Sequence, residues 1–143
     1  MDTIVVGVDG SPGADEAVRF AAHEAALRDA ALRMVTVWHV PTAAYGGIGV
    51  AVVDPGAEFE EDANRCLEET AKRLEAELAG LKVEPVVREG TAARVLVEES
   101  ADAALLVVGS RGHGGFVGLL MGSVSGQCAH HASCPVAIVP SDN

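Results

Sequence analysis

The chain is poor in aromatic and basic residues. The first shortage determines which side chains build the core, and the second disfavours general binding to polyanions. Aromatic side chains make up 3% of the 143 residues and hydrophobic ones 49%, so Val, Leu, Ile and Ala must build the core. Ten Lys and Arg stand against 21 Asp and Glu, which gives a net charge of −11. General binding to nucleic acid or to anionic membranes is not expected, because their phosphates would be repelled. Any phosphate ligand must therefore be held locally.

Cysteines and long apolar runs are also scarce. The three cysteines are odd in number and form no Cys-x-x-Cys pair, which disfavours a disulfide framework and fits a reducing cytoplasm. No basic segment precedes the first apolar run, and no run is long enough to cross a membrane, so neither a signal peptide nor a membrane span is expected. We expect one cytoplasmic domain over residues 1–143 that buries about two-thirds of its unfolded surface.

Short β-rich runs alternate with helix-like stretches, which is typical of an α/β protein built from parallel βαβ units. The expected strands are near residues 3–8, 33–40, 82–88, 104–108 and 136–139, and the four expected helices are near 11–30, 57–79, 92–102 and 123–132. Ser11 and Pro12 supply an N-cap and a first-turn proline for the first helix. Gly80 is the expected stop of the second helix, and Pro85 favours an edge position for the third strand.

The most informative segment follows the fourth expected strand. Gly109-Ser110-Arg111-Gly112 leaves an apolar run, and Gly122-Ser123 stands where the last helix is expected to begin. Glycine allows close backbone approach, and the amides and dipole of a helix N-terminus attract anions. Arg111 adds a positive charge, and the hydroxyls of Ser123 and Ser125 add donors. The segment predicts a phosphate cradle, with a plain surface loop as the alternative.

Other familiar sites fit less well. A P-loop needs a Gly-Lys-Ser/Thr triplet, and no lysine follows Lys82. The dinucleotide fingerprint, with glycines two and three residues apart, does not directly follow the strand. Zinc binding by Cys128, His130, His131 and Cys134 is disfavoured, because His130 would leave the helix face that Cys128 and His131 share and Cys134 begins the next strand. No metal site is predicted.

Gly109, Gly112, Gly122 and Ser123 match the pattern Gly-x2-Gly-x9-Gly-Ser/Thr, which resembles the ATP-binding signature of the universal stress protein family. The opening Ile4-Val5-Val6-Gly7-Val8-Asp9-Gly10-Ser11 resembles that family's first strand and acidic turn, and Cys134-Pro135-Val136-Ala137-Ile138-Val139 resembles its closing strand. The resemblance implies a doubly wound, flavodoxin-like or Rossmann-like open parallel sheet of five strands in the order 3-2-1-4-5. The chain order would then reverse between strands one and four, where Asp9 and Gly109 stand and where such sheets bind ligands.

The resemblance also implies a ligand and its contacts. ATP, together with Mg, is the implied ligand, and the implied activity is that of a nucleotide-dependent stress-response regulator rather than a metabolic enzyme. Asp9 and the backbone of Val40 would bind the adenine and ribose, while the phosphates would lie among Gly109, Arg111, Gly112, Gly122, Ser123 and Ser125. Asp9 as a cap of the turn before the first helix, and Ser123 as a helix N-cap, remain open.

Two further functions stay open. The first is a slow ATPase or nucleotidyl-transfer enzyme, for which Asp9 is the only evident carboxylate near the phosphates. The second is a dimerisation module that binds AMP, a cyclic nucleotide or nothing.

Val136–Val139 carries no charge to block strand pairing, which predicts a homodimer through this edge, as the resemblance also implies. The long connection 41–56 has four glycines and is expected to act as a lid, with simple disorder as the alternative.

Overall fold

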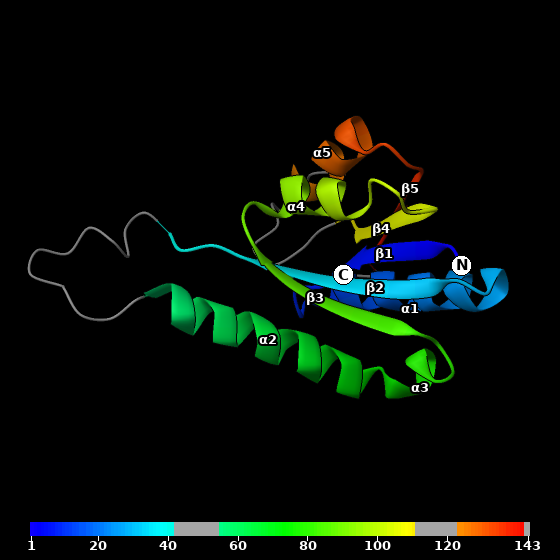
Figure 1. Cartoon of the computed structure of the whole chain (residues 1–143), viewed down its shortest axis with the longest axis horizontal. Helices are drawn as coiled ribbons and strands as arrows, with labels where there is room; N and C mark the ends of the chain where they lie inside the picture. The colour runs from blue at the N-terminus through cyan, green and yellow to red at the C-terminus, as the bar shows by residue number, and fades with distance from the viewer. Residues whose placement is uncertain (42–54, 111–122, 142–143) are drawn as a thin grey trace, which may run out of the picture.

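The sheet has five parallel strands, seen here in a computed structural model that describes residues 1–41, 55–110 and 123–141. The strands are β1 (Thr3–Gly7), β2 (Ala31–Trp38), β3 (Val83–Glu89), β4 (Leu105–Gly109) and β5 (Val136–Val139). Their order is β3-β2-β1-β4-β5, as expected (Figure 1). β3 and β5 are therefore the edges, which confirms the edge position predicted from Pro85.

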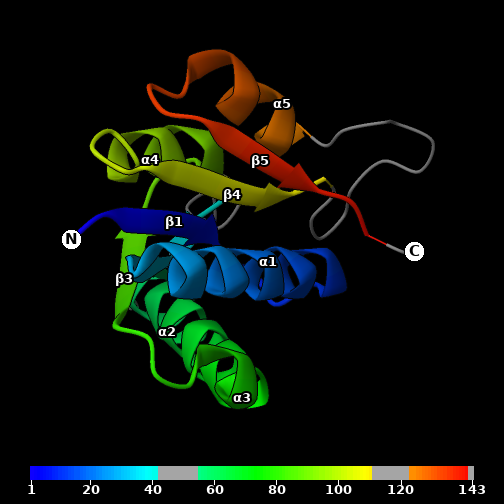
Figure 2. The ribbon, with the colours of Figure 1, turned by 90° about the vertical axis from the view of Figure 1, so that its right-hand side faces the viewer.

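The helices cover both faces of the sheet. Figure 2 shows α1 (Pro12–Arg28), α2 (Pro55–Arg73) and α3 (Glu75–Leu78) on one side, with α4 (Ala92–Glu99) and α5 (Ser123–His131) on the other. The single helix expected over 57–79 is divided at Leu74, whose φ of −106° and ψ of 25° depart from helical values. Leu74 is only 1% exposed, so the helix is divided at a residue whose side chain lies in the core.

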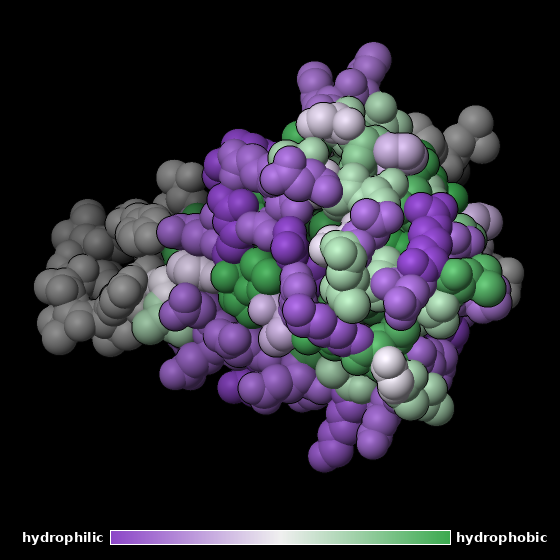
Figure 3. Space-filling model, turned by 45° about the vertical axis from the view of Figure 1, so that its right-hand side comes forward, coloured by the Kyte–Doolittle hydropathy of each residue, from purple (hydrophilic) through white to green (hydrophobic). Residues whose placement is uncertain are grey.

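Strand alternation builds a core on each side of the sheet. Ile4 and Val6 join the layer under α1 and α2, while Val5 joins the layer under α4 and α5, and all three are fully buried. Burying each such side chain stabilises the fold by about 1.5–3 kcal/mol. The outer surface carries the charge: Figure 3 shows hydrophilic side chains over much of one face, with smaller hydrophobic areas between them.

Helix ends follow the expected chemistry. Ser11 caps α1, since its side-chain oxygen accepts a hydrogen bond of 3.1 Å from the amide of Ala14, and Pro12 begins the helix. Gly80 has a φ of +82°, a conformation that glycine adopts without strain. Across the two long helices, Asp15 accepts two hydrogen bonds, of 3.0 and 2.9 Å, from the guanidinium of Arg73. Among the described helices, none has both the length and the apolarity to span a bilayer.

Candidate functional site

The carboxyl ends of β1 and β4 meet where the order of the chain reverses. The two strands are parallel neighbours, with Val6 opposite Val107 (Figure 2). Asp9 lies two residues beyond the end of β1, and Gly109 is the last residue of β4. Parallel sheets bind ligands at such reversals, because the connections leave toward opposite faces and open a crevice. The predicted reversal of the sheet between β1 and β4 is confirmed.

A hydrogen-bonded turn joins β1 to α1 at this reversal. The Oδ1 of the exposed Asp9 accepts a hydrogen bond of 2.9 Å from the amide of Ser11, and Gly10 between them has a φ of +80°. Asp9 therefore has the turn-capping contact that was left open as an alternative. A carboxylate accepts several hydrogen bonds, so a ribose contact by Asp9 stays a prediction.

Gly109 lies directly against the first turn of α1. A Cβ placed on it would be 2.9 Å from the carbonyl oxygen and 3.0 Å from the carbonyl carbon of Gly13. Close backbone approach at Gly109 was predicted, but with a ligand as the neighbour. The structure shows a second neighbour, the backbone of α1, which brings the N-terminal end of that helix to the end of β4.

The start of α5 is bonded to the end of β4. The Oγ of Ser125 donates to the carbonyl oxygen of Ser110 at 3.3 Å, and the amide of Ser110 donates to the carbonyl oxygen of Val139 at 2.9 Å. Ser125 is 1% exposed, whereas Ser123, the first residue of α5, is exposed. The two predicted phosphate donors thus have different surroundings although both lie in the first turn.

The remaining predicted contacts are divided between described and undescribed residues. The half-buried Val40 lies two residues beyond the end of β2, so it lies with Asp9 at the carboxyl ends of the strands. Arg111, Gly112 and Gly122 lie outside the described residues, as does most of the expected lid, residues 42–54. The described part of the chain therefore brings Asp9, Val40 and Gly109 to the carboxyl ends of the strands, where the start of α5 also lies.

Comparison with known proteins identifies the family. A family model described as the universal stress protein family matches residues 1–140. The chain belongs to this family.

Three similar proteins illustrate the match. A universal stress protein of Mycolicibacterium smegmatis is 37% identical over 145 aligned positions, which cover 98% of this chain and 48% of the relative. A solved universal stress protein in complex with cAMP is 29% identical, covers 99% of this chain and 98% of its own, and has a TM-score of 0.71. A universal stress protein from Archaeoglobus fulgidus in complex with dAMP is 24% identical, covers 96% and 97%, and has a TM-score of 0.65. The chain spans about half the length of the curated relatives it matches.

In this universal stress protein, one residue beside the acidic turn was not predicted. Cys66 of α2 lies under Gly10, since a Cβ on that glycine would be 3.3 Å from the Cys66 sulfur. Burial raises the pKa of the Cys66 thiol, and the nearby charge of Asp9 raises it further. Cys66 shares the apolar side of its helix with Leu67 and Leu74, and this spacing indicated burial but not the contact with the turn.

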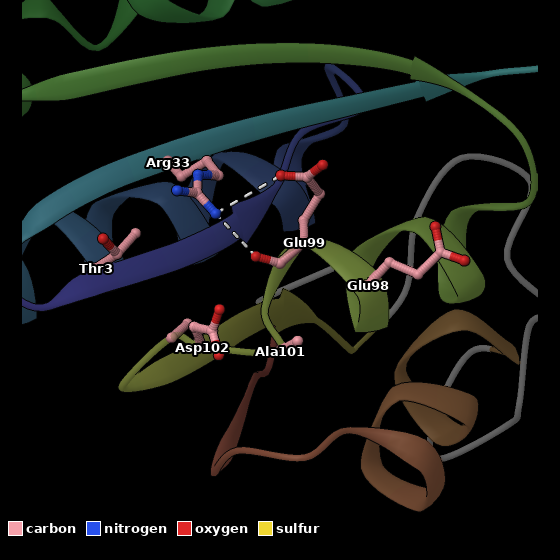
Figure 4. Close-up of a pocket in the computed structure, with 7 residues that line it drawn as sticks. Thr3, Arg33, Glu98, Glu99, Ala101 and Asp102 are labelled. Atoms are coloured by element: carbon pink, nitrogen blue, oxygen red, sulfur yellow. Dashed lines mark hydrogen bonds and ion pairs between the residues drawn. The ribbon is translucent and has the colours of Figure 1, made fainter.

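A pocket of about 180 Å³ lies at the other end of the strands, near the amino ends of β1 and β4 (Figure 4). Arg33 donates to the carbonyl oxygen of Glu99 at 2.9 Å and to the Oε1 of Glu84 at 3.1 Å. The bond from Arg88 lowers the pKa of Glu98, which also pairs with Arg94. These charges are balanced within the protein. Among the residues that the structure describes, no group of three or more His, Cys, Asp or Glu could hold a metal ion.

Proposed function

We propose that this universal stress protein binds an adenine nucleotide in the crevice between β1 and β4, and that the bound nucleotide makes it a stress-response regulator. The observation that carries the proposal is that the Asp9 turn, the end of β4 and the start of α5 lie at one reversal of the sheet. The 29% identical universal stress protein solved in complex with cAMP supports an adenine nucleotide as the ligand class.

Electrostatics orients the ligand within the crevice. The carboxylate of Asp9 would repel phosphates, so the adenosine end belongs beside Asp9 and the backbone of Val40. The phosphates then belong beside Gly109 and the start of α5, where amides, the helix dipole and the exposed Ser123 favour anions. Ser125 lies in the same turn, and Arg111, Gly112 and Gly122 of the glycine pattern complete the proposed contacts.

We infer ATP as the physiological ligand, accompanied by Mg²⁺. The phosphates themselves would hold the metal, since Mg²⁺ keeps several waters and is commonly bound through substrate phosphates. A cyclic nucleotide is the second candidate, favoured by the cAMP complex of the 29% identical protein. Either would be retained as a structural ligand that biases the conformation or the association of the protein.

We also infer a homodimer that acts in the cytoplasm. β5 is an edge strand, and its four residues Val136–Val139 are uncharged and only half-buried in the single chain. Soluble proteins normally block or cover such an edge, and a second copy paired along it would cover it. The three cysteines are free thiols in the structure, which supports a reducing compartment.

Two measurements test nucleotide binding. Mass spectrometry of the denatured protein identifies any nucleotide that survives purification. Thermal unfolding of the nucleotide-free protein with ATP, AMP, cAMP or GTP then ranks the ligands, because a ligand at about 100 times its Kd stabilises the folded state by about 2.7 kcal/mol. For 143 residues this raises Tm by about 9 °C.

Gly122→Val is the decisive variant, because a side chain would obstruct the approach of backbone amides to phosphate. We expect it to lose the rise in Tm with ATP while remaining folded. Ser100→Ala changes a buried serine near the amino ends of the strands and is the control. It should keep the rise in Tm with ATP. An unchanged rise in Gly122→Val would refute the cradle.

A further inference from the structure

Ser110 is held from two sides by the elements that follow it. Its amide donates to the carbonyl oxygen of Val139 in β5, and its own carbonyl oxygen accepts from the hydroxyl of Ser125 in α5. Ser110 is 8% exposed and Ser125 is 1% exposed, so both bonds are shielded from water. We call the bond between these two serines the serine clasp.

The clasp lies on the inner side of α5. Ser125 and Cys128, three residues apart, are the buried residues of this helix, while Ser123 is exposed. Successive helical residues are separated by about 100°, so Ser123 and Ser125 are roughly 160° apart around the axis. The hydroxyl of Ser125 therefore contacts the end of β4 on the side of the helix away from Ser123.

We propose that Ser125 is a positioning residue of the nucleotide site, and that the serine clasp fixes the first turn of α5 so that its amides meet the phosphates. The inference rests on the proposed function and changes the role of Ser125 within it, from a phosphate donor to the residue that holds the donors in place.

Preorganisation is the physical reason for this effect. The glycine pattern begins at Gly109, the last residue of β4, and ends at Ser123, the first residue of α5. The clasp joins Ser110, one residue after Gly109, to Ser125, two residues after Ser123. Losing it lets the start of α5 move relative to β4. The ligand must then offset the free energy of ordering that turn, so affinity for the phosphates falls without the loss of a direct contact.

The test compares three variants of the full chain. Ser125→Ala removes the clasp. Ser125→Thr keeps the hydroxyl and should restore it. Ser100→Ala is a matched control, because the Oγ of the fully buried Ser100 also donates to a backbone carbonyl at 3.3 Å, that of Val97, near the amino ends of the strands. The probes are ATP and adenosine, measured by calorimetry, and amide hydrogen exchange of the nucleotide-free protein.

We expect Ser125→Ala to weaken ATP binding by roughly three- to tenfold and to leave adenosine binding within about twofold. In the absence of nucleotide, exchange should rise roughly fivefold at the amide of Ser110 and in α5, because the bond that closes this turn is lost. Ser125→Thr should behave as wild type in both measurements. Ser100→Ala should lose stability without any change in ATP affinity.

Each other result overturns the inference. Weaker ATP binding with wild-type exchange in the free protein would make Ser125 a direct phosphate contact. Faster exchange with unchanged ATP affinity would make the clasp purely structural. Failure of wild type to bind ATP, AMP or cAMP would refute the proposed function itself and the positioning role with it, and this is seen before any variant is made.

Discussion

A methyl group at Gly109 is the sharpest perturbation that the structure offers. In Gly109→Ala the new Cβ would lie 2.9 Å from the carbonyl oxygen of Gly13, 3.0 Å from its carbonyl carbon and 3.4 Å from the amide nitrogen of Ala14. All three atoms belong to the backbone of α1, so no side-chain rotation relieves the contact. Either β4 or the first turn of α1 must shift.

The expected cost follows from two opposing effects. Overpacking of a tight interior typically costs about 1–3 kcal/mol. Replacing glycine by alanine recovers about 0.4–1 kcal/mol through the lower entropy of the unfolded chain. The net loss is about 1–2 kcal/mol. With an unfolding entropy of about 2.1 cal/mol/K for each of the 143 residues, this lowers Tm by about 3–7 °C.

Gly7→Ala is the matched control, since Gly7 is the last residue of β1 as Gly109 is of β4. A Cβ there would meet Cδ1 of Leu96 at 3.1 Å, the far end of a side chain that can adjust. We expect Gly7→Ala to change Tm by less than about 3 °C, because the smaller contact and the entropic gain nearly cancel. Thermal unfolding by circular dichroism measures both. A Gly109→Ala protein no less stable than Gly7→Ala would refute the close approach of β4 to α1.

Three further outcomes are expected. Ile138→Glu, by placing a charge on the β5 edge, should yield a monomer in light scattering where the wild type is a dimer, and a dimeric variant would exclude this interface. ATP turnover should stay far below 1 s⁻¹, since Asp9 is proposed to lie at the adenosine end; turnover near that rate, lost in Asp9→Asn, would favour an enzyme. Burial raises the pKa of the Cys128 thiol to about 11. Between pH 9 and 11 the unfolded chain therefore releases a proton that the folded protein keeps. The free energy of unfolding should fall by about 2–3 kcal/mol across this range. Urea unfolding at several pH values should show that the free energy of unfolding falls less steeply with pH in Cys128→Ala than in the wild type. Equal falls in the two proteins would count against the raised pKa of Cys128.

The sheet and its reversal were predictable because they depend on local patterns and on the family resemblance. The exact ends of the elements were not. β2 was expected near 33–40 but spans Ala31–Trp38, since it begins where Ala31 pairs with Thr3 of β1. Likewise, the division of the second helix at Leu74 depends on where that side chain is buried. Both features are set by contacts between distant segments, which periodicity does not contain.

The site shows the same limit. Gly109, Ser123 and Ser125 could be assigned to the end of β4 and the start of α5 from the order of strand, glycine pattern and helix. Their individual contacts could not, because Gly109 packs against a backbone 96 residues earlier and the partner of Ser125 lies 15 residues earlier. The inward side of Ser125 did leave a signal in its spacing of three from the apolar Cys128, which places both on one helix face.

The last prediction concerns salt, and it follows from a net charge of −11 on a protein proposed to bind a polyanion. Sites that bind phosphates through many cations lose affinity steeply with salt, because displaced counterions drive the binding. Here the proposed phosphate contacts are backbone amides, hydroxyls and one cation, Arg111, while the rest of the surface repels ATP at long range. Raising NaCl from about 0.05 to 0.5 M shortens the screening length from roughly 14 to 4 Å, which weakens that repulsion as well as the attraction of Arg111. We therefore expect the Kd of ATP, measured by calorimetry with uncharged adenosine as the control, to change by less than about threefold. A tenfold or greater weakening of ATP alone would mean that several cations hold the phosphates and that helix amides do not dominate the site.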